Sequence, residues 1–289
     1  MFTRMPRYRL FCRRFRPWTA LAVLLGLCVL APAEATAAPK AELWQRWARH
    51  DPQAAARIDH AAWDGFLARY VKTDADGPNR VAYGRVAPAD KAALGAYIEG
   101  LGKISIGRFN RGEQRAYWIN LYNALTVKLI LDHAPVASIR DIDISPGLFS
   151  DGPWGKKLIR IENTEVGLDD IEHRILRPIW RDARLHYAVN CASVGCPDLM
   201  PRAFTAANTE SLLEKGARAY VNSPRGARFE NGRLIASKIY SWFAEDFGGD
   251  EAGVLAHLKR YANPDLARRL NGVTEIDSYD YDWRLNGAP

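Results

Sequence analysis

The segment Gln114–Leu131 has the clearest helical pattern in the chain. Its large apolar residues recur at intervals of three and four: Trp118, Leu121, Tyr122, Leu125 and Leu129. Because residues at this spacing share one face of an α-helix, we predict a long buried helix that ends at His133-Ala134-Pro135. Asn120 and Asn123 lie three residues apart on a second face of this otherwise apolar helix. Both amides must therefore find hydrogen-bond partners, either in neighbouring loops or in a bound substrate.

Other helices and short strands are predicted along the rest of the chain. The helices are two segments within Ala41–Ala68 that break near Asp51-Pro52, then Pro88–Leu101, Leu168–Trp180, Asn208–Val221, Lys238–Phe247 with Ser237 as its cap, and Glu251–Arg260. The strands are Lys157–Glu162, Leu185–Cys191 and a hairpin at Gly226–Arg233. No internal repeat or low-complexity linker divides them. We therefore expect one α+β domain, with helices packed on a small, mainly antiparallel sheet.

The first 37 residues have the composition of an export signal. Several arginines precede a short apolar run, Ala20–Leu30, and Ala35-Thr36-Ala37 matches the pattern of a cleavage site. This order predicts a secretory signal peptide over residues 1–37, cleaved near Ala37, and a periplasmic or secreted mature protein. The apolar run has about half of the ~20 residues that a membrane-spanning helix needs, so we expect no permanent membrane span after cleavage. Leu-Gly-Leu before Cys28 disfavours a lipid anchor there.

Most of the basic character of the chain lies in this predicted signal. The signal contains six arginines and one acid, Glu34, so cleavage lowers the formal charge from +7 to +2. No run of Lys and Arg with interleaved aromatic residues remains, which disfavours nucleic acid as a partner. The remaining 252 or so residues are rich in Trp, Tyr and Phe and are long enough to bury a substantial core. We therefore predict a packed globular protein.

The segment Arg184–Pro197 gathers residue types that carry chemistry. It contains Cys191 and Cys196, the only cysteines outside the predicted signal, and His186 precedes them. Such residues supply a thiolate nucleophile, a general base, metal ligands or a disulfide, so four interpretations are open. Cys191 falls at the end of the predicted strand, where open α/β sheets and many α+β sites place their chemistry.

Two histidines are candidate partners for the thiol. His186 lies about 16 Å from Cys191 if the strand is straight, so a direct contact requires a bend, and His173 from the preceding helix is the other candidate. In that helix, Leu168–Trp180, Glu172 falls near the middle of the apolar stripe. A carboxylate aimed at the core is costly unless a cation or several donors meet it. Glu172 therefore either pairs with an arginine or orients a histidine.

A set of short motifs is spread along the chain: Trp118-Ile119-Asn120-Leu121-Tyr122-Asn123-Ala124, Ile171-Glu172-His173-Arg174-Ile175-Leu176-Arg177, His186 through Cys191-Ala192-Ser193 to Cys196-Pro197, Ser237-Lys238-Ile239 with Trp242, Asp246-Phe247, and Tyr281-Asp282-Trp283. Together they resemble the motifs of the domain-of-unknown-function family 547 (DUF547), over most of the mature chain. The resemblance implies a single domain at 38–289, with a helical part at 38–105 and a papain-like or transglutaminase-like core at 106–289. It also implies a Glu-His-Cys arrangement, which maps onto Glu172, onto His173 and His186, and onto Cys191 and Cys196.

These residues lead to a hypothesis of thiol acyl transfer. Cys191, before Cys196, would be deprotonated by a histidine that Glu172 holds, and would attack a carbonyl group. Backbone N–H groups of Ala192–Gly195 would stabilise the oxyanion. Glu113 is the alternative acid. Such a hydrolase or acyltransferase would need no cofactor and would act on amide bonds of small peptides or cell-wall material.

Three alternatives stay open at this point. A Cys191–Cys196 disulfide in an oxidising compartment would leave no nucleophile. A zinc site made of both cysteines with His173 and His186 has suitable ligand types, but it lacks cysteine pairs spaced by two residues. The last alternative is a non-catalytic binding module, in which the asparagines of the central helix and the aromatic C-terminal segment hold a partner protein or glycan.

Overall fold

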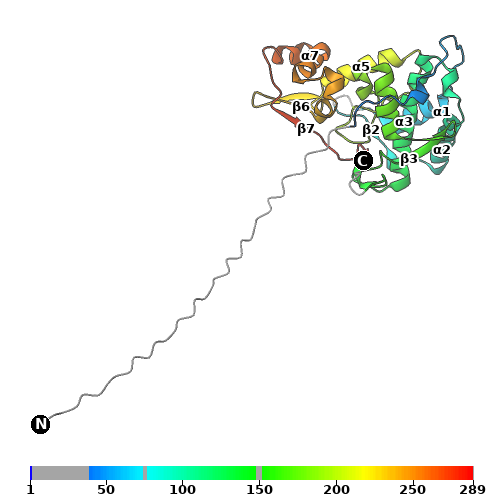
Figure 1. Ribbon diagram of the computed structural model, residues 1–289, viewed down its shortest axis with the longest axis horizontal. Coiled ribbons are helices and arrows are strands. Elements are labelled where there is room, and N and C mark those ends of the chain that lie inside the picture. Colours follow the sequence, from blue (N-terminus) through cyan, green and yellow to red (C-terminus); the bar gives the residue numbers. More distant parts are fainter. Residues whose placement is uncertain (2–38, 74–76, 148–151, 289) are drawn as a thin grey trace. The chain divides into compact units, whose positions relative to one another are not determined.

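The helix α3, Arg111–His133, lies at the centre of the main hydrophobic core (Figure 1). The fold is described here from a computed structural model, which covers residue 1 and residues 39–73, 77–147 and 152–288. Asn110 caps α3 because its side-chain oxygen accepts a hydrogen bond from the N–H of Glu113 at 3.0 Å. The long buried helix predicted from the sequence is confirmed, and this cap makes it begin three residues earlier than predicted.

Several helices surround α3. They are α1 (Ala61–Tyr70), α2 (Pro88–Gly102), α5 (Thr209–Val221) and a π-helical segment, η5 (Asp170–Leu176), which continues into α4 (Arg177–Trp180). Of these, α2, α5 and η5 contact α3, and α1 packs on α2. The helices predicted at Pro88–Leu101, Leu168–Trp180 and Asn208–Val221 are therefore confirmed.

The N-terminal part contains less helix than the sequence predicted. In place of the first of the two helices expected within Ala41–Ala68 there is a single 3₁₀ turn, η1 (Gln45–Ala48). The second helix, α1, begins only at Ala61. The Asp51-Pro52 break is real, but the chain stays irregular after it. Other 3₁₀ turns connect the elements: η2 (Tyr83–Arg85), η3 (Ile106–Arg108), η4 (Ile139–Asp141), η6 (Ala183–Tyr187) and η7 (Ala244–Phe247).

The strands of the described residues form three small sheets instead of the single sheet expected. Antiparallel pairs join β1 (Val71–Lys72) to β2 (Arg80–Val81) and β3 (Lys157–Ile161) to β4 (Thr164–Gly167). The predicted hairpin is present as β5 (Ala227–Glu230) and β6 (Arg233–Ser237), and β7 (Ser278–Asp280) adds to β6 in parallel. The α+β class is confirmed, with mainly antiparallel pairing.

The strand predicted at Leu185–Cys191 is wrong. Residues Ala183–Tyr187 form η6, because the Asp182 side chain accepts a hydrogen bond from the N–H of Arg184 at 3.0 Å and starts a tight turn. Within that turn the N–H of Ala188 bonds to the carbonyl of Leu185 at 2.9 Å. These local bonds use backbone groups that a sheet ladder would need. The segment therefore reaches Cys191 as a turn followed by irregular chain.

A second hydrophobic cluster contains the three-stranded sheet together with α6 (Lys238–Trp242), α7 (Glu251–Tyr261) and α8 (Pro264–Arg269). Ser237 caps α6 as predicted, since its hydroxyl accepts a hydrogen bond from the N–H of Ile239. The helix predicted at Lys238–Phe247 is shorter, because Phe243 leaves helical geometry at φ −116° and ψ 29° and η7 follows it. The helix predicted at Glu251–Arg260 is confirmed as α7.

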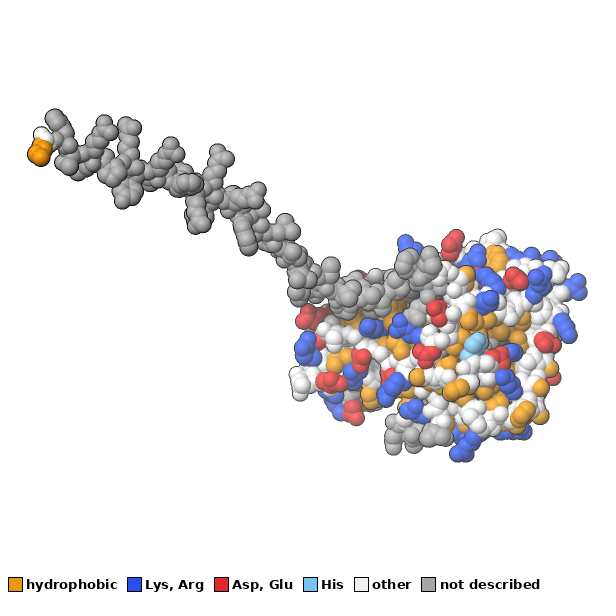
Figure 2. All heavy atoms as spheres, turned by 90° about the horizontal axis from the view of Figure 1, so that it is seen from below, with side chains coloured by type: hydrophobic (Ala, Val, Ile, Leu, Met, Phe, Trp, Pro, Cys, Tyr) orange, Lys and Arg blue, Asp and Glu red, His pale blue; other side chains and the backbone are white. Residues whose placement is uncertain are grey.

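The described residues from 39 to 288 make up one compact unit. On the face drawn in Figure 2, Lys and Arg side chains are interspersed with Asp and Glu side chains across the described residues. None of the helices that the structure describes has the length and apolar character needed to cross a bilayer. Apart from Met1, the predicted signal peptide and its predicted cleavage site near Ala37 lie outside the described residues.

Candidate functional site

Cys191 lies in a cluster of hydroxyl groups. Its Sγ is 3.0 Å from the hydroxyl of Tyr281 and 3.3 Å from that of Ser193, and these two hydroxyls are 2.9 Å apart. The backbone N–H of Cys191 donates to the Sγ of Cys196 at 2.8 Å, and the two sulfurs form no disulfide. Cys196 is buried, whereas Cys191 is partly exposed. We call Cys191, Ser193, Cys196 and Tyr281 the thiol site.

These contacts shift the pKa values of the two cysteine thiols in opposite directions. Burial alone would raise the pKa of Cys191, but hydrogen bonds from Cys196, Ser193 and Tyr281 outweigh it and leave that pKa below the usual thiol value. Burial raises the pKa of Cys196 well above that value, and the neighbouring Cys191 raises it further. Cys191 is therefore the cysteine whose thiolate is stabilised, and Cys196 remains a thiol.

The turn after Cys191 is fixed by the C-terminal segment of the chain. The N–H of Val194 donates to the carbonyl of Arg284, and the N–H of Gly195 to the carbonyl of Asp282, both at 2.8 Å. A Cβ atom at Gly195 would lie 2.8 Å from the backbone nitrogen of Asp282, so only glycine allows this close approach. The cysteine loop and the C-terminal segment thus form one rigid structure.

The oxyanion hole predicted from the backbone of Ala192–Gly195 is not supported, because these N–H groups already have acceptors. The N–H of Ala192 donates to the side-chain oxygen of Asn190 at 2.9 Å. That of Ser193 bonds to the Cys191 sulfur. The other two donate to the C-terminal segment, as described above. The loop therefore uses its N–H groups to hold itself and the thiol, and offers none of them to a substrate.

Asn120 and Asn123, the predicted substrate contacts, both hold loops. The amide of Asn123 donates to the carbonyl of Ala188 and accepts from the N–H of Asn190, each at 2.8 Å. Asn120 makes the same pair of bonds to the backbone of Phe204, at 2.8 and 2.9 Å. Both side chains are fully buried. Their contacts agree with the first interpretation, that they hold neighbouring loops, and Asn123 positions the chain that leads to Cys191.

A second polar cluster surrounds His186. Its Nε2 is 2.7 Å from Oδ2 of Asp246, and its Nδ1 is 3.7 Å from Oε1 of Glu172. Arg177 donates from Nε to the same Asp246 oxygen at 2.5 Å. The His186 ring stacks on Phe243 with a centroid distance of 4.1 Å. We call these residues the imidazole cluster.

The imidazole cluster explains why Glu172 faces inward. Among the described residues Glu172 meets His186 and not an arginine, so of the two roles predicted for it, the contact with a histidine is the one present. Burial would raise the pKa of Asp246, but hydrogen bonds from His186 and Arg177 lower it to about 2. Asp246 therefore stays ionised and holds the imidazole from the side opposite Glu172.

His173, the other candidate base, is engaged elsewhere. Its Nδ1 accepts a hydrogen bond from Arg177 at 3.1 Å, and its Nε2 is 3.7 Å from Asp169. Burial lowers the pKa of His173, and the Glu172 charge only partly offsets this. Burial also raises the pKa of Asp169 to about 6. His173 is thus a neutral ring that fixes Arg177.

No described histidine makes a hydrogen bond to the sulfur of Cys191 or Cys196. Tyr122 is a common neighbour of the two groups, because its hydroxyl is hydrogen-bonded to Glu172 and is in electrostatic range of both cysteines. The predicted contact between the thiol and a histidine is therefore absent from the described residues, and the thiol site and the imidazole cluster are separate groups that share this neighbour.

The remaining sequence candidates are placed elsewhere or do not converge. Glu113 accepts a hydrogen bond from the N–H of Ile58 at 3.0 Å in the first turn of α3, where it anchors the N-terminal chain. Among residues 39–73, 77–147 and 152–288, no group of three or more His, Cys, Asp or Glu side chains is arranged to hold a metal ion. The two histidines and two cysteines of the zinc alternative therefore do not form a metal site.

Comparison with known protein families identifies the family to which the segment around the site is related. The model of the family "Protein of unknown function, DUF547" matches residues 106–221. This segment belongs to the DUF547 family. The match covers less of the chain than the motifs suggested, and it begins at the residue where the core was predicted to begin. No curated protein and no solved structure matches the chain.

The DUF547 segment contains most of the site residues but not all of them. Glu172, His186 and Cys191 lie within it, but Asp246 and Tyr281 lie beyond its end. Sequence reasoning did not select Asp246, Tyr281 or Ser193 as site residues. The signal was present, because all three belong to the short motifs that carry the family resemblance, but no local pattern assigned them a role.

Aromatic side chains adjoin the thiol site, one from the DUF547 segment and three from beyond its end. The rings of Trp242, Tyr281 and Trp283 contact one another, with centroid distances between 4.7 and 5.6 Å. Trp154 makes an edge contact with Trp283 at 5.8 Å. All four rings are partly exposed. We call them the aromatic wall; it offers apolar contact area to a molecule that reaches the Cys191 sulfur.

Proposed function

We propose that the protein is an exported thiol-dependent hydrolase or acyltransferase that cleaves an amide or peptide-type bond with Cys191 as nucleophile. The observation that carries the proposal is the contact set of this one sulfur. Cys191 is partly exposed, it receives hydrogen bonds from Tyr281 and Ser193, and its pKa lies below the usual thiol value. A thiolate is the reactive form of cysteine, and reactive cysteines have a lowered pKa and access to solvent.

In the proposed reaction the Cys191 thiolate attacks the carbonyl carbon of the substrate. A C–S bond forms, the C–N bond breaks, and the leaving amine takes up a proton through the hydrogen-bonded hydroxyls of Ser193 and Tyr281. Water then adds to the thioester, gives a proton back to the hydroxyl pair, and releases the acid and the thiolate. With an amine in place of water, the same steps transfer the acyl group.

The role of His186 follows from its position in the imidazole cluster. Its two ring nitrogens face Asp246 and Glu172, so we assign the ionisation of the thiol to Ser193 and Tyr281. Of the two candidate histidines, His186 fits the Glu-His-Cys arrangement implied by the family resemblance better, because it faces Glu172. Catalytic hydrogen bonds are often long without substrate and tighten in the complex. In our account His186 acts only after the substrate is bound.

The substrate class follows from export and from the aromatic wall. An exported enzyme meets small peptides and cell-wall amides, and partly exposed Trp242 and Trp283 beside the thiol can hold the apolar or cyclic part of such a molecule. The papain-like character of the core is part of this proposal. It rests on the motif resemblance and on the pairing of a thiol with a neighbouring imidazole cluster.

The proposal is tested by labelling the unreduced protein with a thiol-directed electrophile that carries a peptide-like acyl group. We expect rapid labelling that Cys191→Ala abolishes and Cys196→Ala retains, because burial keeps Cys196 protonated and covered. Mass spectrometry of the labelled peptide identifies the residue. Equal, slow labelling of both cysteines would contradict a nucleophilic role.

One observation favours the alternative, a non-catalytic periplasmic binding module with a Cys191–Cys196 disulfide. The backbone nitrogen of Cys191 already lies 2.8 Å from the Cys196 sulfur, so the two cysteines are close, and no imidazole within the described part of the chain is hydrogen-bonded to either sulfur. Thiol titration of protein purified without reductant separates the two functions. The enzyme requires free thiols, whereas the binding module predicts none.

A further inference from the structure

A small basic hollow lies between η1, η3 and the turn that joins β3 to β4. Its volume is about 230 Å³, and its walls include Arg46, Arg49 and Arg108. None of its lining residues belongs to the thiol site or to the imidazole cluster. Pockets that hold whole drug-sized molecules measure about 300–1,000 Å³, so this hollow fits a single small group.

The charges around the hollow are unbalanced. Arg46 faces the only acid in the lining, Glu162, at 3.8 Å, and also donates to its backbone carbonyl at 2.5 Å. The guanidinium groups of Arg49 and Arg108 make no hydrogen bond or ion pair with any residue that the structure describes. Three arginines against one glutamate leave a local formal charge of +2. All three arginine side chains are exposed and solvated, and the positive potential that they create together attracts anions to the hollow.

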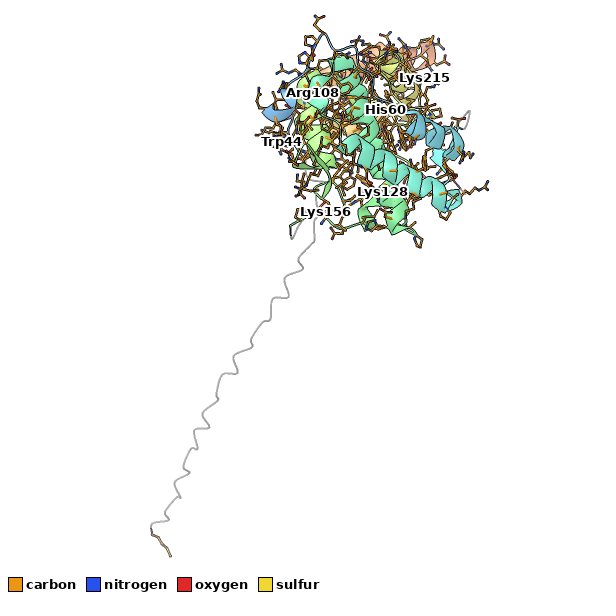
Figure 3. All side chains as sticks on the ribbon, turned by 90° about the vertical axis from the view of Figure 1, so that its right-hand side faces the viewer. Trp44, His60, Arg108, Lys128, Lys156 and Lys215 are labelled. Carbon is orange, nitrogen blue, oxygen red and sulfur yellow. The ribbon has the colours of Figure 1, made fainter. Side chains whose placement is uncertain are left out.

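The arginines are held in place by their neighbours. The stem of Arg49 lies against η3, with its Cδ 3.6 Å from the position that a Cβ of Gly107 would occupy. Arg46 lies over the ring of Trp47 at 5.2 Å. In Figure 3 the labelled Arg108 lies on the same side of the described unit as Trp44, the residue before η1. The hollow is thus built by two short segments that the core fixes.

Trp47 supplies a second, independent sign of a missing ligand. It lines the hollow, its side chain is only 3 % exposed, and its indole N–H is buried without an acceptor among the described residues. Buried donors without a partner are rare in folded proteins and call for an explanation. Trp47 therefore combines an unpartnered donor with a place in the wall of the hollow, and an anion that neutralises the arginines there would change the surroundings of its indole.

We propose that this hollow binds a phosphate monoester group. A phosphate monoester carries a charge of about −1.5 to −2 at neutral pH and has three acceptor oxygens, which matches the local charge and the several donors. Planar guanidinium groups bind phosphate through paired N–H donors. The ligand is either a soluble phosphate or the headgroup of a phosphate-bearing lipid, and both offer the same chemistry. The inference does not depend on the activity proposed for Cys191.

The experiment titrates the ¹⁵N-labelled full protein at constant ionic strength with inorganic phosphate, glycerol 3-phosphate or vesicles that contain phosphatidic acid. The readout is the indole N–H signal of Trp47, identified by its loss in Trp47→Phe. We expect this signal to shift on binding. Arg49→Gln and Arg108→Gln should each weaken binding by about tenfold, because each removes charged hydrogen bonds. Arg202→Gln, an exposed arginine outside the hollow, is the matched control and should bind as the unchanged protein does.

Each outcome decides the proposal. A shift with the soluble phosphates alone identifies a free ligand, and a response to phosphatidic acid vesicles alone, absent with phosphatidylcholine vesicles, identifies a lipid headgroup. Both results support the site if Arg49→Gln weakens them. The proposal is overturned if the Trp47 signal stays in place with all three probes, or if Arg49→Gln and Arg202→Gln respond alike.

Discussion

The hydroxyl of Tyr281 lies 3.0 Å from the sulfur of Cys191, although ninety residues separate them in the chain. The C-terminal segment that carries Tyr281 also accepts hydrogen bonds from the backbone of Val194 and Gly195. One segment therefore both shapes the cysteine loop and provides the hydroxyl that stabilises the thiolate. In our account the acidity of Cys191 depends on this long-range contact.

Asn123→Ala should lower the free energy of unfolding, because Asn123 holds a loop and is not itself a reactive group. The substitution leaves the carbonyl of Ala188 and the N–H of Asn190 buried without partners, which costs about 2–4 kcal/mol in the free energy of unfolding. Urea unfolding measures this loss. Asn271→Ala at an exposed position serves as control and should cost less than about 0.5 kcal/mol. A wild-type stability for Asn123→Ala would mean that the amide does not hold the loop.

Asp246→Asn should change how stability depends on pH. Folding lowers the pKa of Asp246 to about 2, below its value in the unfolded chain, so its contribution is present above about pH 4 and is lost as the pH falls towards 2. The variant should therefore be less stable than the wild type at pH 6, and the difference should shrink steadily between pH 4 and pH 2. Chemical denaturation of both proteins at each pH measures it. A difference that is constant across this range would rule out the proposed pairing with His186 and Arg177.

Asp169→Asn should have the opposite pH dependence. Folding raises the pKa of Asp169 to about 6, so its ionised form destabilises the protein above that pH and the cost disappears below about pH 4. We expect the variant to be more stable than the wild type at pH 8 and about equal to it at pH 4. The same denaturation series provides the comparison. Lower stability of the variant at pH 8 would show that burial does not dominate this carboxyl group.

Gly195→Ala should disturb the thiol site through the backbone. The new Cβ would lie 2.8 Å from the Asp282 nitrogen and 3.0 Å from its carbonyl oxygen, so the cysteine loop and the C-terminal segment must move apart. We expect Cys191 to lose most of its excess reactivity at neutral pH, because Tyr281 moves with that segment. Gly95→Ala, in α2 where the added Cβ meets nothing within 4 Å, should leave the reactivity unchanged. Iodoacetamide alkylation rates at pH 7 distinguish the two.

The sequence predicted those parts of the fold that local pattern determines. The apolar spacing of residues 114–131 predicted α3, and Asn-Gly between two short strands predicted the β5–β6 hairpin. The strand at Leu185–Cys191 was wrong because alternation of apolar residues does not reveal that Asp182 starts a tight turn. A side-chain hydrogen bond to the backbone decided that segment.

The candidate site was predicted by residue type but not by contact. Glu172 was expected to face the core and to meet either an arginine or a histidine, and it lies 3.7 Å from His186. Tyr281 and Asp246 were missed as site residues because their partners are 90 and 60 residues away, and no periodic pattern encodes such contacts. The distance between the thiol and the imidazoles could not be predicted from the sequence either, because it depends on the packing of η5, η6 and the C-terminal segment.

The most direct test is the pH dependence of Cys191 alkylation by iodoacetamide, followed at Cys191 by mass spectrometry, in the unchanged protein, in Tyr281→Phe and in His186→Gln. Cys196 is retained in all three because its hydrogen bond also lowers the pKa of Cys191. Tyr279→Phe, a partly exposed tyrosine in β7 whose hydroxyl has no partner among the described residues, is the control for loss of a phenol. We expect Tyr281→Phe to raise the thiol pKa and to slow alkylation at pH 7 by about 10- to 100-fold, because it removes a hydrogen bond to the thiolate. His186→Gln and Tyr279→Phe should leave the thiol pKa within about 0.3 units. A pKa unchanged in Tyr281→Phe but raised in His186→Gln would contradict the account and assign the thiolate to an imidazole partner.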